Sequence, residues 1–261
     1  MEKQLWALIL GSSSGFGEAT ALELARLGYN IFGVHLDRRA GMAHVEEITS
    51  KIRAAGREVI YFNVNAADAE KRKEVIGRIK EELQKKPGTV RVLLHSLAFG
   101  TLQPLAGSEN DVSQAQMDMT ADVMGHSLVY WTQDLVREGL MVSGGRIYAM
   151  TSSGGTRVMP SYGPVSAAKA ILQSHIRQLA MELAPKGITA NAIRAGVTDT
   201  PALRKIPGSD KMLEGARARN PYGRLTTPQD VAAAIGVLAQ PGTYWMTGNT
   251  IGVDGGEDIV G

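Results

Sequence analysis

A tyrosine and a lysine that could act together on one substrate lie in the stretch SSGGTRVMPSYGPVSAAK at residues 152–169. Tyr162 and Lys169 are seven positions apart, and seven steps along a helix turn through about 700°, so both side chains leave nearly the same face. A phenol has a reference pKa of about 10, but a nearby ammonium favours the phenolate and eases proton donation. The spacing therefore predicts a general acid, Tyr162, assisted by Lys169. In an isolated pair of this kind the tyrosine ring more often packs in the protein and the lysine ammonium is solvated. The surrounding motifs must therefore show whether this pair is catalytic.

Pro164 indicates where the helix that carries this pair begins. Its fixed φ and missing N–H suit the first turn of a helix, so we expect the helix to start near Gly163 or Pro164. Tyr162 then lies at the mouth of the helix, where its phenol faces the adjoining cleft.

A glycine-rich turn follows the first apolar segment of the chain. Residues 5–10 form a short continuous apolar run, which is typical of a strand buried on both faces. Gly11, Gly15 and Gly17 follow, and then apolar residues recur at helical spacing as far as Gly28. Such a unit binds phosphate, because glycine lets the backbone approach a pyrophosphate whose charge is met by N–H groups at the helix start. A plain tight turn is the alternative, and the position after the first strand favours the binding site.

The same alternation of apolar runs and helical patterns continues along the whole chain. It predicts further strands at residues 30–35, 58–64, 90–95, 146–151, 188–194 and 250–253, and further helices at 41–55, 67–85, 113–142, 164–184 and 227–239. The helix at 113–142 is long, and an interruption within it is the alternative. We therefore predict a single α/β domain over residues 1–261, a doubly wound parallel sheet (Rossmann fold) with helices on both faces. Its ligands are expected at the carboxyl ends of the strands. We interpret residues 201–221 as a long connection that acts as a substrate lid.

Composition excludes several classes of function. Lys and Arg number 28 against 26 Asp and Glu, a net charge of +2, and no basic run is interleaved with aromatic residues, so we expect no nucleic-acid partner. The chain has no cysteine, which excludes disulfides and thiolate metal sites. His95 lacks partners at ligand spacing and is interpreted as a hydrogen-bonded histidine at a strand end, so we expect no metal. Without a membrane-length apolar run or a signal peptide, we expect a cytoplasmic protein.

Taken together, the ordered motifs resemble those of the short-chain dehydrogenase/reductase family over essentially the full length. The matching pieces are GSSSGFG at 11–17, Asn63 and Val64, the loop after the fourth strand, Ser152 ahead of the lysine helix, NAIRAG at 191–196 with Thr198 and Thr200, and VDGG at 253–256. The resemblance implies a nicotinamide-dependent oxidoreductase. The residues that it implies for cofactor binding are Gly11, Ser13, Ser14, Gly15, Phe16, Gly17, Asn63 and Val64 beside the adenine, Ser96, Leu97 and Ala98 beneath the ribose and nicotinamide, Lys169 on the ribose hydroxyls, Gly196, Thr198 and Thr200.

Within this family the sequence is similar to a divergent branch, the enoyl-[acyl-carrier-protein] reductases. The typical family member has tyrosine four residues before the lysine, where this chain has Val165, and an aliphatic side chain cannot donate a proton. Tyr162, with six residues between it and Lys169, matches the branch instead, as do HSLAFG at 95–100 and Met124. The resemblance implies reduction of the carbon–carbon double bond of an enoyl thioester in fatty acid biosynthesis by a homotetramer, with acyl carrier protein as a possible partner. The candidate catalytic residues are Tyr162, Lys169 and Ser152.

The position of the tyrosine bears on the substrate. Reduction of a ketone puts hydride and negative charge on neighbouring atoms, whereas reduction of an enoyl thioester puts hydride on the β-carbon and charge on the distant thioester oxygen. Moving a tyrosine three residues toward the helix start shifts its origin by about 4.5 Å, which suits the enoyl reaction. The branch often has a second tyrosine where this chain has Ser152, the residue of ordinary ketone reductases. A ketone or hydroxysteroid-type dehydrogenase is therefore the alternative, followed by a non-catalytic dinucleotide-binding protein, for which Tyr162 and Lys169 would be unnecessary.

The loop after the second strand bears on which dinucleotide binds. An acidic residue at this strand end favours NADH, and nearby arginine favours the extra phosphate of NADPH. Because Arg38 and Arg39 follow Asp37, we expect them to contact a 2′-phosphate, and we expect NADPH. Asp37 could instead hold a bare ribose, which keeps NADH possible, or pair with Arg39. A solvated turn is a further alternative.

The connection at 201–221 carries apolar and basic residues. Met212 and Leu213 could cover an acyl chain or pack ordinarily. Its basic residues are Arg204, Lys205, Lys211, Arg217 and Arg219. Such a face could steer an acidic carrier protein toward the site, and solvated charge is the alternative.

Overall fold

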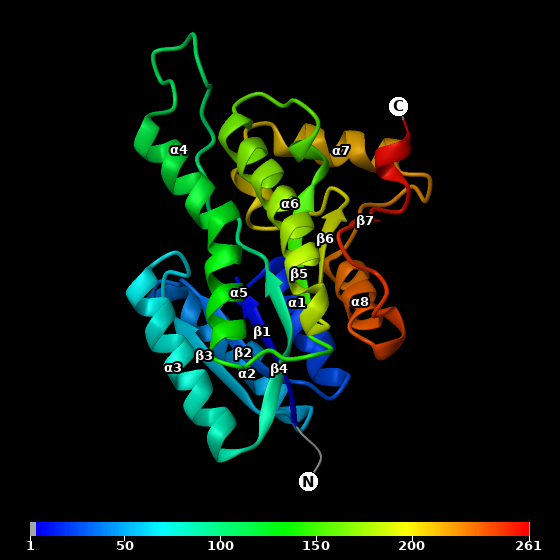
Figure 1. Cartoon of the computed structure of the whole chain (residues 1–261). Helices are drawn as coiled ribbons and strands as arrows, with labels where there is room; N and C mark the ends of the chain where they lie inside the picture. Colours follow the sequence, from blue (N-terminus) through cyan, green and yellow to red (C-terminus); the bar gives the residue numbers. More distant parts are fainter. Residues whose placement is uncertain (1–3, 261) are drawn as a thin grey trace.

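The computed structural model describes residues 4–260, which form a parallel sheet covered by helices (Figure 1). The strands are β1 (Gln4–Leu10), β2 (Asn30–His35), β3 (Val59–Asn63), β4 (Gly88–His95), β5 (Arg146–Ser152), β6 (Thr189–Ala195) and β7 (Thr250–Val253). They lie in the order β3-β2-β1-β4-β5-β6-β7, and each neighbouring pair is parallel. The predicted doubly wound sheet is confirmed.

Helices cover both faces of this sheet. They are α1 (Gly15–Arg26), α2 (Met42–Ala54), α3 (Ala69–Lys85), α4 (Gln114–Ala121), α5 (Ser127–Arg137), α6 (Gly163–Leu183), α7 (Ser209–Arg219) and α8 (Pro228–Leu238). Among the helices of residues 4–260, none is both long and apolar enough to cross a membrane.

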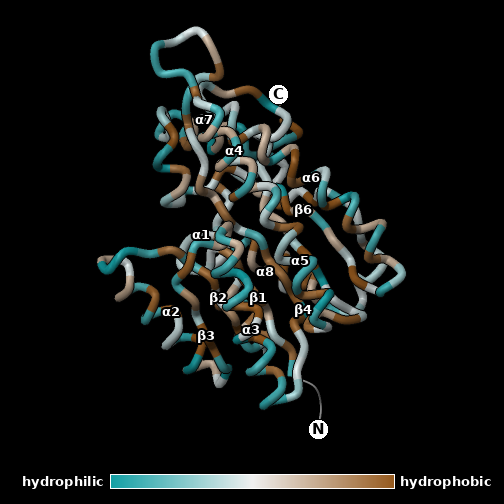
Figure 2. The backbone as a smooth tube through the Cα atoms, turned by 60° about the vertical axis from the view of Figure 1, so that its left-hand side comes forward, coloured by the Kyte–Doolittle hydropathy of each residue, from teal (hydrophilic) through white to brown (hydrophobic). Residues whose placement is uncertain are grey.

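Side chains of β1 alternate between two hydrophobic cores. Trp6, Leu8 and Leu10 join apolar side chains of α3, α5 and α6, whereas Ala7 and Ile9 join those of α1, α2 and α8. Successive strand residues point to opposite faces, so a strand covered on both sides needs an unbroken apolar run. Figure 2 shows this run as hydrophobic colour along the central strands.

The strand order reverses between β1 and β4. From β1 the chain proceeds outward to β2 and β3, and it then returns to β4 and proceeds the other way to β7. The loops that leave the carboxyl ends of β1 and β4 therefore diverge and open a crevice, which is where ligands of doubly wound sheets bind.

The helix predicted at 113–142 consists of three segments and ends earlier, at Arg137. Between α4 and α5, residues Asp122–His126 form a π-helical turn. The hydroxyl of Ser127 donates a 2.8 Å hydrogen bond to the carbonyl of Val123 within it. Such turns are frequent at functional sites, and this one carries two buried residues, Val123 and Met124, toward the crevice.

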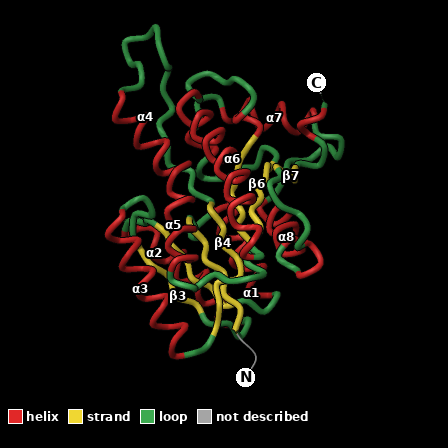
Figure 3. Tube along the Cα trace, in the orientation of Figure 1, coloured by secondary structure: helices red, strands yellow, loops and turns green. Residues whose placement is uncertain are grey.

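Residues 201–221 are more ordered than the sequence predicts. A 3-10 turn, Leu203–Lys205, is followed by the helix α7 (Figure 3), so the prediction of a plain connection is wrong for Ser209–Arg219. Leu213 and Ala216 are buried on one side of α7, and tertiary packing of this narrow stripe stabilises an otherwise charged helix.

Candidate active site

The glycine-rich turn between β1 and α1 brings backbone segments into close contact. Gly11 has φ of +88°, and a Cβ there would overlap the carbonyl oxygen of Ser96 at the end of β4. A Cβ on Gly17 would overlap the carbonyl oxygen of Gly11. Ser14 is the N-cap of α1, but its side chain makes no capping hydrogen bond, so N–H groups of the first turn remain available to an anion. The turn therefore fits a pyrophosphate held by backbone groups.

A cleft extends from this turn along the carboxyl ends of the strands. It brings together these expected cofactor residues: Gly11, Ser13, Ser14, Gly15, Phe16, Val64, Ser96, Leu97, Ala98 and Thr200. A second pocket adjoins it and adds Lys169, Gly196 and Thr198. Thr200 and the segment 96–98 line both, so the cleft and the pocket form one continuous site.

Tyr162 and Ser152 bring two hydroxyl groups to this pocket. Ser152 is the last residue of β5, and Tyr162 is the N-cap of α6, followed by Pro164 in the first turn. Their oxygen atoms are 3.4 Å apart, and Tyr162 is 8% exposed. The ring of Tyr162 packs so closely on Gly154 that a Cβ at position 154 would lie 2.5 Å from it. The ring is therefore fixed in position, and Tyr162 lines the pocket with its hydroxyl beside that of Ser152.

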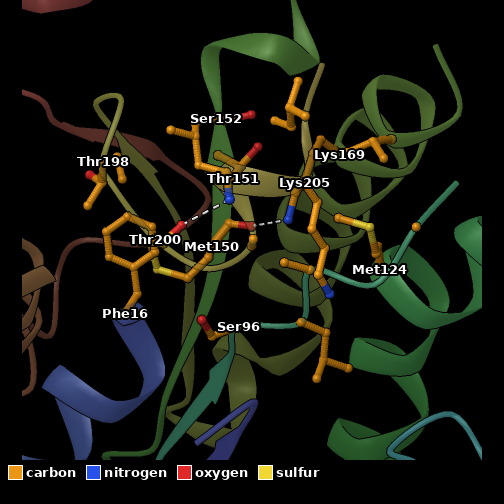
Figure 4. A pocket seen from close by; sticks show the side chains of 18 of the residues that line it. Phe16, Ser96, Met124, Met150, Thr151, Ser152, Lys169, Thr198, Thr200 and Lys205 are labelled. Atoms are coloured by element: carbon orange, nitrogen blue, oxygen red, sulfur yellow. Dashed lines mark hydrogen bonds between the residues drawn. The ribbon is translucent and has the colours of Figure 1, made fainter. Parts of the chain in front are cut away.

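Lys169 is buried beneath the same pocket. Its ammonium donates a 2.8 Å hydrogen bond to the carbonyl of Met150 (Figure 4), and burial lowers its pKa to about 8. Burial raises the pKa of Tyr162, and the hydrogen bond from Ser152 opposes this rise. The expected lowering of the Tyr162 pKa by Lys169 is therefore not what the structure shows, because the phenol is desolvated and the ammonium is directed to a backbone carbonyl. Tyr162 is a neutral hydrogen-bond donor at physiological pH.

Apolar side chains form the rest of the pocket wall. Val165, at the position of the usual family tyrosine, lines it one turn further along α6 than Tyr162. Met124 from the π-helical turn and Leu102 lie in the same wall, as do Leu203 and Ile206 from the segment after β6. Such a wall suits an apolar acyl group. Leu203 and Ile206 were not expected here, and the residues expected to cover an acyl chain, Met212 and Leu213, do not line the pocket.

His95 is buried at the end of β4. Its Nε2 lies 2.8 Å from the hydroxyl of Ser127, and burial lowers its pKa to about 3, so the ring is neutral. Its Nδ1 has no hydrogen-bond partner among residues 4–260. The hydrogen bond expected of a histidine at a strand end is therefore present at Nε2 only. The same residues contain no cluster of three or more side chains able to hold a metal ion.

The loop after β2 differs from expectation in its side-chain partners. Asp37 accepts a 2.9 Å hydrogen bond from Nδ1 of His35, not from Arg39. Asn63 accepts from the N–H of Asp37 and donates to its carbonyl, so Asn63 fixes this loop and does not line the cleft. Arg38 and Arg39 are exposed, and within residues 4–260 neither forms an ion pair.

The 3-10 turn after β6 has two basic residues with different surroundings. Arg204 forms short ion pairs with Asp199 and Asp210. Lys205 lines both the cleft and the pocket, and its side chain extends into the pocket in Figure 4. The basic character expected of this segment is therefore partly neutralised at Arg204.

Comparison with known proteins agrees with this geometry. The sequence model of the family described as Enoyl-(Acyl carrier protein) reductase matches residues 11–257. The chain belongs to the short-chain dehydrogenase/reductase family. It is an NAD(P)H-dependent oxidoreductase, and the glycine turn and cleft described above fit its nicotinamide dinucleotide cofactor.

Relatives and structural neighbours of this family member act on different substrates. A 1-cyclohexenylcarbonyl-CoA reductase from Streptomyces collinus is 30% identical over 97% of this chain and 87% of its own length. An enoyl-[acyl-carrier-protein] reductase (NADH) from Aquifex aeolicus has a solved structure with a TM-score of 0.84 and 27% identity, covering 100% of this chain and 98% of that one. A promiscuous reductase that catalyses a keto-reduction in lugdunomycin biosynthesis has a TM-score of 0.83 and 27% identity, covering 98% of each chain.

Proposed function

We propose that the protein reduces the carbon–carbon double bond of an enoyl thioester with NADPH, as an enoyl-acyl carrier protein reductase of fatty acid biosynthesis. One observation carries the proposal. The phenol that reaches the pocket belongs to Tyr162, and the position three residues further along α6 is the aliphatic Val165. A donor at residue 162 is displaced by about 4.5 Å along the helix axis, which suits charge that develops away from the reduced carbon.

Tyr162 would act by stabilising the oxygen of the substrate thioester. The bound cofactor would supply hydride, and reduction of the substrate at its β-carbon would leave negative charge on the thioester oxygen. The buried phenol keeps its proton, so it can donate a hydrogen bond to this oxygen as the charge grows. Ser152, 3.4 Å from the phenol oxygen, orients the hydroxyl. A proton from water would then add to the α-carbon and complete the product, since the phenol keeps its own.

Lys169 would hold the nicotinamide ribose. One of its three N–H donors is directed to the carbonyl of Met150, which leaves two for ribose hydroxyls. The backbone turn at Gly11 and the first turn of α1 would hold the pyrophosphate, and Thr198 and Thr200 lie at the nicotinamide end beside the pocket.

NADPH rather than NADH is supported by the charges after β2. Arg38 and Arg39 are exposed without an ion-pair partner in the described residues, so both can turn to a 2′-phosphate. The carboxylate of Asp37 is held by His35, which makes it less available to a bare ribose.

An acyl carrier protein is the proposed source of the thioester. Arg204 is paired with acidic residues, so the docking charge would come from Lys211 and Arg217, which are exposed on α7 and form no ion pair within residues 4–260. Charge reversal at both should raise the KM for a carrier-bound thioester but not for a small one. Charge reversal at Arg177, exposed on α6, is the matched control, and equal effects on both substrates would rule this docking face out.

Ketone reduction is the second candidate, supported by the contact between Ser152 and Tyr162 and by the structural likeness to a keto-reducing enzyme. Steady-state rates with crotonyl and acetoacetyl thioesters, each with NADPH, separate the two. The proposed function predicts turnover of the crotonyl thioester and little or none of the acetoacetyl thioester. Faster turnover of the acetoacetyl thioester would reject it in favour of the ketone reductase.

A further inference from the structure

A separate cavity lies at the amino-terminal ends of the strands, whereas the active site lies at their carboxyl ends. Its floor comes from the amino-terminal parts of three strands: Arg91 in β4, Arg146 at the start of β5 and Thr189 at the start of β6. Arg146 is six residues from Ser152 along β5, which corresponds to about 20 Å. The cavity is therefore separate from the catalytic pocket and the dinucleotide cleft.

Two guanidinium groups lie in this cavity without a carboxylate. Arg146 is 2% exposed, and its hydrogen bonds run from Nη1 to the carbonyls of Gly144 and Gly145, leaving Nε without a partner. Arg91 makes one long contact, 3.5 Å from Nη1 to the carbonyl of Ser143, and its Nε is also unpaired. Neither arginine forms an ion pair within residues 4–260, and no acidic residue lines the cavity. Burial lowers the pKa of Arg146, and the charge of Arg91 acts in the same direction.

The buried charge of Arg146, beside the half-buried Arg91, is unfavourable without an anion. Buried charges in proteins are normally paired, because removal from water is costly, and like charges add to that cost. The hydroxyl of Thr189, which is also buried without a hydrogen-bond partner, lines the same cavity. The Nε atoms of Arg91 and Arg146 and the hydroxyl of Thr189 are thus donors with no acceptor among the described residues, and such a set of donors matches an oxyanion.

Two aromatic side chains form the rim of the cavity. Tyr244 and Trp245, in the segment between α8 and β7, are 63% and 86% exposed, and their rings meet edge to face at 5.8 Å. Exposed aromatic faces beside a cationic floor suit a ligand that carries its anionic group on a flat ring.

We propose that this cavity binds a phosphate monoester attached to a flat ring, in the manner of a nucleoside monophosphate. Two guanidinium groups match the double charge of a phosphate monoester better than the single charge of a carboxylate. Arginine binds phosphate oxygens in a bidentate manner. The ring of the ligand lies against Trp245 and Tyr244.

Thermal unfolding with the cofactor at saturation tests this site, because the dinucleotide cleft is then occupied. The probes are inorganic phosphate and AMP, compared with sodium chloride at the same ionic strength. We expect Tm to rise by about 5 °C at ligand concentrations 100-fold above Kd. Arg91→Gln should weaken both probes by about 10-fold or more, the usual loss for one charge-assisted hydrogen bond. Trp245→Ala should weaken AMP and leave inorganic phosphate unchanged.

Arg177→Gln, an exposed arginine on α6, is the control and should bind both probes as the wild type does. Equal responses to phosphate and chloride, or unchanged binding in Arg91→Gln, would overturn the proposal. So would a shift in mass by light scattering when Arg91 is replaced, with no response to phosphate. In that case the cavity would be filled by an acidic segment of a second copy.

Discussion

Replacement of Tyr162 by phenylalanine examines the proposed donor with little change to the fold. The ring is packed against Gly154 and is 8% exposed, and phenylalanine preserves that packing. The hydroxyl loses a 3.4 Å contact with Ser152, which is longer than the 2.7–2.8 Å typical of such hydrogen bonds. We therefore expect the free energy of unfolding to change by less than about 1 kcal/mol.

The same substitution should have a large effect on catalysis. Loss of one preorganised donor to a developing oxyanion costs about 2.7–4 kcal/mol, or about 10²–10³ in kcat. The assay is oxidation of NADPH with a crotonyl thioester, with Kd for NADPH measured separately. Kd should stay unchanged, because the residues that line the cofactor cleft are intact. A variant that retains most of the wild-type kcat would refute the assignment of Tyr162.

The double variant Tyr162→Phe/Val165→Tyr sharpens this test. It returns the phenol to the position where the typical family member has it, about 4.5 Å along the helix axis. Since Ser152 is already present, we expect the variant to gain activity on an acetoacetyl thioester while activity on the crotonyl thioester stays low.

Three further predictions concern the cofactor site and stability. Burial lowers the pKa of Lys169 to about 8, against about 10.4 for an unfolded lysine, so the unfolded chain binds more protons than the folded one between these pH values. The free energy of unfolding should therefore rise by about 3 kcal/mol as the pH rises through this window. Lys169→Met should flatten this rise when stability is measured by urea titration. Gly17→Ala should abolish dinucleotide binding in calorimetry, because its Cβ overlaps the Gly11 carbonyl, whereas Gly77→Ala, with open space in α3, should stabilise the protein by about 0.5–1 kcal/mol. Arg38→Ala combined with Arg39→Ala should raise Kd for NADPH by about 10-fold or more and leave that for NADH unchanged, an outcome that equal effects on both would contradict.

Local patterns in the sequence were sufficient for most of the fold. The apolar run before Gly11 and the proline after Tyr162 each determine structure within a few residues, so β1 and the start of α6 follow the predictions. The helix α7 was missed because its stability depends on Leu213 and Ala216 packing against distant parts of the chain. An apolar stripe this narrow leaves little helical periodicity of hydrophobic residues in the sequence.

The sequence predicted which backbone loops meet at the site better than it predicted the contacts between side chains there. The glycine turn and the cleft residues meet as expected because strand order brings their loops together. Contacts between polar side chains depend on tertiary geometry, which spacing does not specify. Lys169 therefore bonds the carbonyl of Met150, and Asn63 bonds Asp37. For the same reason, nothing in the sequence indicated that Arg91 and Arg146 share one cavity.

The most direct test of the central claim follows the transferred hydrogen. NADPH carrying deuterium at the reactive position is incubated with a crotonyl thioester, and the product is examined by NMR. We predict a butyryl thioester with one deuterium on the β-carbon. Recovery of unlabelled crotonyl thioester, with deuterium transferred only to the carbonyl carbon of an added ketone, would contradict it.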